Sequence, residues 1–204
     1  MPASACKVLI GFGRAAAVAA VLGCLAMVGT PAMAKSITGV SPARPQPDSK
    51  SLAPGIAVEY AVRYVRWVDE LKTTSGWKKG KPLAQIDYNT GNGNVLTSDR
   101  TEGVCARLKG FIKLDKTGDY QFAIQSNDGV RMKLDGKVII SDPGVHYDQF
   151  SPNVTVPIST PGWYALDMEY FQRRGTATLE LYWQPPGTDS FEFVPASAFA
   201  HSKP

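Results

Sequence analysis

The chain has few cysteines and few histidines, and this limits the chemistry open to it. Its 204 residues include three cysteines and two histidines, and neither His146 nor His201 stands at metal-ligand spacing from a cysteine. A glycine-rich phosphate loop and a nucleophilic-serine motif are also absent from the sequence. We therefore expect a protein that is not an enzyme and has no catalytic residues.

Only Cys105 remains after residue 34, so we expect no disulfide within that part of the chain. Cys105 is expected to be a small packing residue, because nothing in the sequence places a base beside it. It shares its strand parity with Arg107 and Lys109, which predicts that it is less buried than Val104 or Ala106.

A strong excess of one charge is also lacking. Removing residues 1–34 takes away Lys7 and Arg14 and no acidic residue, which lowers the formal charge from +4 to +2. Proteins that bind nucleic acid usually show a basic stripe, so we expect no nucleic-acid partner.

Long hydrophobic runs are absent except near the N-terminus. An acid-free apolar run extends over residues 15–28, after two basic residues, and the small-x-small triplet Ala32-Met33-Ala34 follows it. This pattern predicts a secretory signal peptide over residues 1–34, cleaved before Lys35. The mature chain would then be exported, to the periplasm or the extracellular space, and would have no transmembrane segment.

A lipoprotein route is the alternative for this N-terminus. Val21-Leu22-Gly23-Cys24 resembles the motif in which a cysteine becomes the lipid-modified first residue. Bulky Leu22 stands where a small residue is usual, and the apolar run continues past Cys24. The signal peptide fits the sequence better.

Residues 35–54 are rich in proline, serine and lysine and lack apolar periodicity. This composition predicts a flexible linker that precedes a folded domain over residues 55–200.

The folded region alternates apolar and polar residues with a period of two. Alternation is strict over residues 104–114 and continues from Tyr120 to Ile140, where Asp135-Gly136 is typical of a tight hairpin turn. Short strands separated by frequent turns predict an all-β fold, an antiparallel β-sandwich or barrel. Residues 57–71 fit either a strand or a helix, because their apolar spacing suits both.

One junction between two predicted strands combines a carboxylate, an amide and a flexible backbone, in Asn127-Asp128-Gly129. We expect this turn to present Asp128 outward, where it could contact a ligand or a cation. The other interpretation is that these residues only supply turn chemistry. Tyr147, in the polar loop 142–148, is the aromatic residue expected to approach Asp128 and pack on a ligand.

The sequence resembles the PA14 domain, a β-sandwich module of secreted glycosidases, adhesins and toxins. The matching segments are Gly118-Asp119-Tyr120-Gln121-Phe122, residues 126–132, Leu134-Asp135-Gly136-Lys137, Pro161-Gly162-Trp163-Tyr164, Glu169-Tyr170, residues 179–183 and Val194-Pro195-Ala196. Together they cover most of residues 108–199.

The resemblance implies a carbohydrate-binding function assisted by calcium. In the sugar-binding adhesins of the family, two adjacent aspartates joined by a cis peptide hold a calcium ion that coordinates sugar hydroxyls. Here Asn127 stands in the first of these positions, so Asp128 and Asn127 would ligate calcium with one negative charge fewer. The expected partner is an extracellular or envelope glycan. The alternative is an envelope module that binds a protein or has a structural role, without sugar binding.

Overall fold

The described residues, 35–203 of this computed structural model, form two layers of β-strands. The seven-stranded sheet contains β1 (Lys35–Ser36), β5 (Asp87–Gly91), β7 (Gly118–Asn127), β10 (Gln149–Phe150), β11 (Val154–Ile158), β13 (Ala177–Gln184) and β14 (Glu192–Phe193). The eight-stranded sheet contains β2 (Leu52–Pro54), β3 (Ala57–Val62), β4 (Lys78–Lys79), β6 (Val104–Leu114), β8 (Val130–Leu134), β9 (Lys137–Asp142), β12 (Gly162–Gln172) and β15 (Phe199–Ser202). Three short 3₁₀ helices complete the described part: η1 (Ser49–Ser51), η2 (Val68–Thr73) and η3 (Ala196–Ala198).

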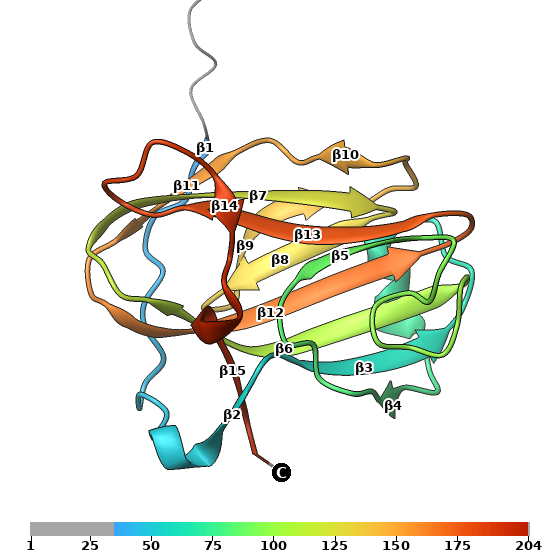
Figure 1. The fold of residues 1–204 in the computed structure, drawn as a ribbon, viewed down its shortest axis with the longest axis horizontal. Helices are drawn as coiled ribbons and strands as arrows, with labels where there is room; N and C mark the ends of the chain where they lie inside the picture. Colours follow the sequence, from blue (N-terminus) through green and yellow to red (C-terminus); the bar gives the residue numbers. More distant parts are fainter. Residues whose placement is uncertain (1–34, 204) are drawn as a thin grey trace, which may run out of the picture. The chain divides into compact units, whose positions relative to one another are not determined.

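The two sheets stack to make a sandwich, with β7 and β13 in one layer and β6, β12 and β8 in the other (Figure 1). Strand order is β1-β11-β7-β13-β14 in the first sheet and β2-β15-β6-β12-β8-β9 in the second. All pairs between these strands are antiparallel except β1 with β11. The predicted all-β class is therefore confirmed. The predicted signal peptide and Cys24 lie outside the described residues, and no helix within residues 35–203 is long and apolar enough to cross a membrane.

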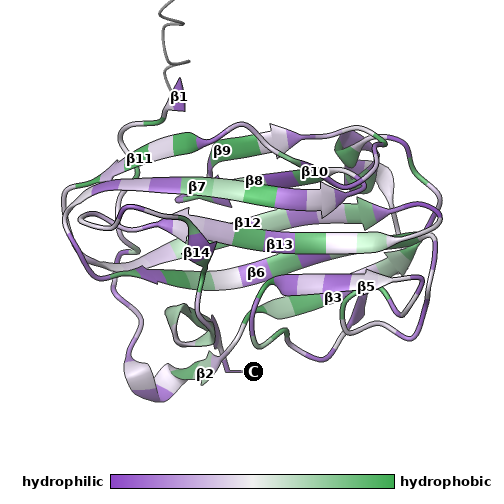
Figure 2. Cartoon of the chain, turned by 45° about the horizontal axis from the view of Figure 1, so that its top comes forward, coloured by the Kyte–Doolittle hydropathy of each residue, from purple (hydrophilic) through white to green (hydrophobic). Residues whose placement is uncertain are grey.

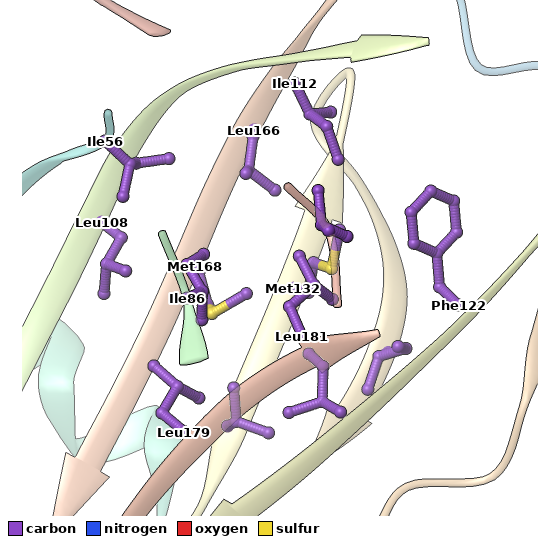
Figure 3. Packing of buried hydrophobic residues seen from close by; sticks show 14 of the residues in the cluster. Ile56, Ile86, Leu108, Ile112, Phe122, Met132, Leu166, Met168, Leu179 and Leu181 are labelled. Carbon is purple, nitrogen blue, oxygen red and sulfur yellow. The ribbon is translucent and has the colours of Figure 1, made fainter. Parts of the chain in front are cut away.

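The core lies between the sheets because each long strand alternates its side chains. On β12 the inward residues are Tyr164, Leu166, Met168 and Tyr170, none more than 1% exposed. They meet residues of the opposite sheet such as Phe122 and Leu181 (Figure 3). Truncating one buried aliphatic side chain to alanine costs about 2–5 kcal/mol, so this alternation fixes which side of each strand is buried. Hydrophilic and hydrophobic residues alternate along strands of the sandwich, as the colours of Figure 2 show.

The predicted hairpin at Asp135-Gly136 is confirmed. Both residues have positive φ, 50° and 72°, and they connect β8 to β9 in antiparallel register. For residues 57–71, each alternative holds over one part: Ala57–Val62 is a strand, and the short helix η2 begins at Val68.

A second, smaller core covers the outer side of the eight-stranded sheet near the end of β12. It consists of Ala61, Val65, Val68, Leu71, Cys105 and Phe171. The expectation that Cys105 is less buried than its neighbours was wrong: it is 0% exposed, because η2 lies over that side of β6. Burial raises the pKa of its thiol to about 11, so Cys105 is a neutral packing residue at physiological pH.

Residues 35–54 lie against the sandwich. β1 pairs in parallel with β11, Val40 is 6% exposed, and β2 pairs with β15. The backbone N–H of Ala43 also donates to the carbonyl of Trp163, at 2.8 Å. The prediction of a free linker was wrong, since composition does not reveal backbone pairing of this kind.

Leu71→Ala tests whether η2 is held by this second core. Leu71 is 0% exposed, so we expect the free energy of unfolding to fall by about 2–5 kcal/mol, measured by urea titration. Val62→Ala is the matched control: Val62 is 58% exposed, and we expect a change within about 0.5 kcal/mol. Equal effects of the two variants would contradict the packing described here.

Candidate functional site

The Asn127-Asp128-Gly129 turn joins β7 in one sheet to β8 in the other, at one end of the sandwich. The peptide bond between Asn127 and Asp128 is cis. Asn127 is 4% exposed and Asp128 is 3% exposed, so the turn does not present Asp128 outward as expected. Its carboxylate is enclosed by the loops that converge at this end.

Asp128 connects this turn to the loop that follows β12. Its Oδ2 accepts the backbone N–H of Arg173 at 2.6 Å, and its own N–H donates to the carbonyl of Phe171 at 3.1 Å. Phe171 N–H in turn donates to the carbonyl of Gly129, at 3.0 Å. Burial raises the pKa of the Asp128 carboxyl, and the backbone N–H groups of Arg173 and His146 oppose that rise.

Asn127 is held by two further hydrogen bonds. Its Nδ2 donates to Oγ1 of Thr176 at 2.9 Å, and its carbonyl accepts the hydroxyl of Tyr170 at 2.6 Å. Burial raises the pKa of Tyr170 well above its ordinary value, so the hydroxyl stays protonated and can donate. The side-chain oxygen of Asn127 is left as an acceptor with a fixed orientation.

The loop between β9 and β10 packs on the same turn. A Cβ atom on Gly129 would lie 2.7 Å from the carbonyl oxygen of Pro143 and 2.8 Å from that of Gly144, so only glycine allows this approach. Two residues further along the chain, His146 contacts the Tyr147 carbonyl oxygen through Nδ1 at 2.8 Å. Tyr147 itself is 91% exposed. The structure therefore places Tyr147 on a loop that touches the turn, with its ring in solvent.

Two exposed aromatic residues at this end were missed by the sequence analysis. Trp67 is 56% exposed and packs beside Gly144, and the next residue, Val68, donates its N–H to the Pro143 carbonyl at 2.9 Å. Tyr64 is 49% exposed and lies 5.5 Å from the Arg174 guanidinium. Both residues follow the end of β3. In the sequence they are noticeable only as two aromatic residues within residues 57–71, whose apolar spacing fits either a strand or a helix.

The loop that follows β12 joins Tyr64 to the Asp128 turn. The carbonyl of Arg173 accepts the N–H of Gly103 at 3.1 Å, and the Tyr64 ring lies over Gly103. We call Tyr64, Trp67 and Tyr147 the aromatic rim.

Buried polar residues concentrate beneath the aromatic rim. Eight polar residues are buried in the described part of the chain, and five of them are at the strand ends here: Ser126, Asn127, Asp128, Gln172 and Thr178. Three of their side-chain atoms, Oγ of Ser126, Oε1 of Gln172 and Oγ1 of Thr178, have no partner among residues 35–203. Buried polar atoms are almost always paired in folded proteins, so these three atoms are unusual for a protein interior.

The donor atoms at the turn suit a hard cation, but weakly. The Asp128 carboxylate and the Asn127 side-chain oxygen are the kinds of ligand that calcium takes. Together they supply one negative charge, and the described residues contain no group of three Asp, Glu, His or Cys side chains that could hold a metal. These two side chains supply fewer oxygen ligands than the roughly six to eight that calcium takes.

A large groove lies elsewhere, on the outer side of the eight-stranded sheet. It has a volume of about 1010 Å³, and Glu59, Lys109 and Asp167 are among its lining residues. Charges of both signs face one another across these strands, as in the contact between Lys133 and Glu169 at 3.6 Å. These alternating charges stabilise the sheet and do not select one ligand charge.

Several solved structures share this fold. The PA14 domain of the antifreeze protein MpAFP has a TM-score of 0.64 at 16% identity, covering 76% of this chain and 93% of that one. The PA14 sugar-binding domain from an RTX adhesin has a TM-score of 0.56 at 17% identity, covering 74% and 99%. The Epithelial Adhesin 6 A domain from Candida glabrata, in complex with Galβ1-3GlcNAc, has a TM-score of 0.60 at 14% identity, covering 76% and 90%.

At these identities the structural matches establish the fold alone. No curated protein sequence matches the chain. The family model of the PA14 domain matches residues 75–195, more than half of the 204 residues. The chain is therefore a member of the PA14 domain family.

Proposed function

We propose that the protein is an exported, non-catalytic module that binds an extracellular or envelope glycan at the Asp128 end of the sandwich. The observation that supports this most directly is the aromatic rim, which lies at the same end of the sandwich as a set of enclosed polar residues. Sugars present apolar C–H surfaces and hydroxyl groups together, so exposed rings beside polar groups suit them. Two structural neighbours, the RTX adhesin domain and the Candida glabrata adhesin, are described as sugar-binding or as sugar complexes.

In this proposal some residues contact the sugar and others hold the loops in position. Tyr147 and Trp67, more than half exposed, pack on the sugar ring. Asp128 keeps the loops that contain Tyr147 and Arg173 in place, since it meets backbone N–H groups from both. Binding energy then comes from apolar contact on loops whose positions are already fixed.

Calcium assists binding weakly in this proposal. Asp128 and Asn127 would hold the ion, which would supply coordination to sugar hydroxyls. With one carboxylate, we expect a dissociation constant in the range of about 10⁻⁴ to 10⁻³ M, as in extracellular modules.

The alternative function is a protein-binding or structural role in the cell envelope. One observation favours it: Val145 is 51% exposed in the same loop as Tyr147, and aliphatic side chains are typical of protein interfaces. A single envelope protein captured specifically, with no glycan bound, would support this alternative.

A glycan array, probed with and without chelator, tests the main proposal. We expect binding to weaken by about tenfold or more in Trp67→Ala and Tyr147→Ala, because each removes an exposed ring. Val138→Ala is the control, since Val138 is 43% exposed on β9 of the eight-stranded sheet. The proposal fails if no glycan binds, or if the rim variants bind as tightly as the control.

Asn127→Asp tests the calcium site by isothermal titration. A second carboxylate should strengthen calcium binding by about tenfold or more, and Asp128→Asn should abolish it, because ligand charge sets the affinity. Asp119→Asn is the control, an exposed carboxylate on the same strand. Unchanged calcium affinity in Asn127→Asp would remove calcium from the proposal and leave the aromatic rim untouched.

The pH dependence of stability tests the enclosure of Asp128. Because its pKa is raised above the ordinary 3.8, the folded protein binds a proton at pH values where the unfolded chain has released it. The Asp128 contribution to the free energy of unfolding should therefore rise as the pH falls from neutral toward 3.8. In urea titrations, wild type should gain stability relative to Asp128→Asn over this interval, and a constant difference would contradict an enclosed carboxylate.

A further inference from the structure

A row of three aromatic rings crosses the outer side of the seven-stranded sheet. Tyr182 on β13 stands in the middle, with its ring 4.5 Å from that of Phe193 on β14 and 5.5 Å from that of Phe150 on β10. The planes of Tyr182 and Phe193 are 26° apart, so these two rings are stacked. We call Phe150, Tyr182 and Phe193 the aromatic row. Strand β14 pairs with β13, and β7 lies between β13 and β10 (Figure 2).

The row exists because of the strand register. Tyr182 pairs with Ala123 on one side and with Phe193 on the other. Phe150 pairs with Gln125, diagonal to Tyr182, and reaches Tyr182 past the small side chain of Ala123. Both sides of the Tyr182 ring are covered in this way, whereas the two outer rings remain open to solvent.

Burial in the core does not account for the rings of Phe150 and Phe193, because both are exposed. Phe150 is 57% exposed and Phe193 is 41% exposed. Among the exposed large apolar residues of the described chain, they alone lie in strands of the seven-stranded sheet. Exposed aliphatic residues are therefore lacking on the described strands around the row, where the exposed apolar surface is aromatic.

Amide and carboxylate groups flank the row. Gln121 and Gln184 are hydrogen-bonded to each other at 3.1 Å, and Tyr182 donates its hydroxyl to Glu180 at 3.0 Å. Burial, with Glu180 beside it, raises the pKa of Tyr182 to about 12, so this hydroxyl remains a donor. These groups are hydrogen-bond partners for hydroxyl groups at the sides of the rings.

Charge restricts the ligand further. Six strands of this sheet, β5, β7, β10, β11, β13 and β14, contain no lysine or arginine and four acidic residues: Asp87, Asp119, Glu180 and Glu192. An anionic polymer would be repelled by such a surface, whereas the carboxylates can accept hydrogen bonds from sugar hydroxyls.

We propose that the aromatic row is a second binding surface, which takes a neutral polysaccharide chain without calcium. Phe150 and Phe193 contact the C–H surfaces of sugar units, and the flanking Gln and Glu side chains bond hydroxyl groups. The row contains none of the residues of the Asp128 end, so this proposal stands or falls independently of the function proposed above.

Titration of the full chain with cellohexaose in excess EDTA tests the proposal, with chitohexaose as a second neutral probe. We expect at least one of the two to bind, and the double variant Phe150→Ala/Phe193→Ala to weaken that binding by about tenfold or more. Val138→Ala, exposed on the other sheet, should bind within about twofold of wild type. Phe150→Ala alone, at the more exposed end, replaces the double variant if circular dichroism shows that the latter is unfolded.

Three results would overturn the proposal: neither probe binds, the Phe150 and Phe193 variants bind as well as wild type, or binding disappears with EDTA. A further result also counts against it: sedimentation shows a protein complex or dimer that the double variant abolishes, while neither sugar binds. Chelator-sensitive binding lost in Tyr147→Ala but kept in the double variant would support the Asp128 end alone.

Discussion

The enclosed carboxylate of Asp128 is the constraint around which the end of the sandwich near this residue is organised: it accepts a hydrogen bond from the backbone N–H of Arg173, a segment distant in sequence. This hydrogen bond joins the turn after β7 to the loop after β12. It therefore connects segments that follow strands of the two different sheets. A charged acceptor with little exposure makes a stronger bond than it would in water, at the cost of its own desolvation. The raised pKa of Asp128 is the measurable sign of that cost.

The loops around this bond are fixed by close packing as much as by polarity. Gly129 allows the Pro143–Gly144 backbone to approach, and Trp67 packs on Gly144 in turn. These contacts fix the position of Trp67 relative to the loop that contains Tyr147. If the aromatic rim binds a glycan as proposed, loops that are already ordered lose less entropy when the ligand binds.

Sequence periodicity predicted the fold well and the site less completely. Strict alternation predicted the full length of β6, Val104–Leu114. The Asp135-Gly136 pair predicted the hairpin between β8 and β9. Both signals depend only on residues that are close in sequence. Packing from elsewhere in the chain was not predictable. The helix η2 buries Cys105 on a side that parity assigned to solvent, and β11 recruits Lys35–Ser36 from a segment that resembles a linker. Asp128 was expected to face outward, yet it is enclosed by loops that are 15 or more positions away in sequence, a contact that local periodicity does not reveal.

The uneven distribution of charge between the layers has an electrical consequence. The strands of the seven-stranded sheet contain four acidic residues and one lysine, whereas those of the eight-stranded sheet contain eight basic and four acidic residues. The strand residues of the two layers therefore carry net charges of opposite sign. A negatively charged surface would therefore attract the strands of the basic layer and leave the rings of Phe150 and Phe193 on the side that faces away from it.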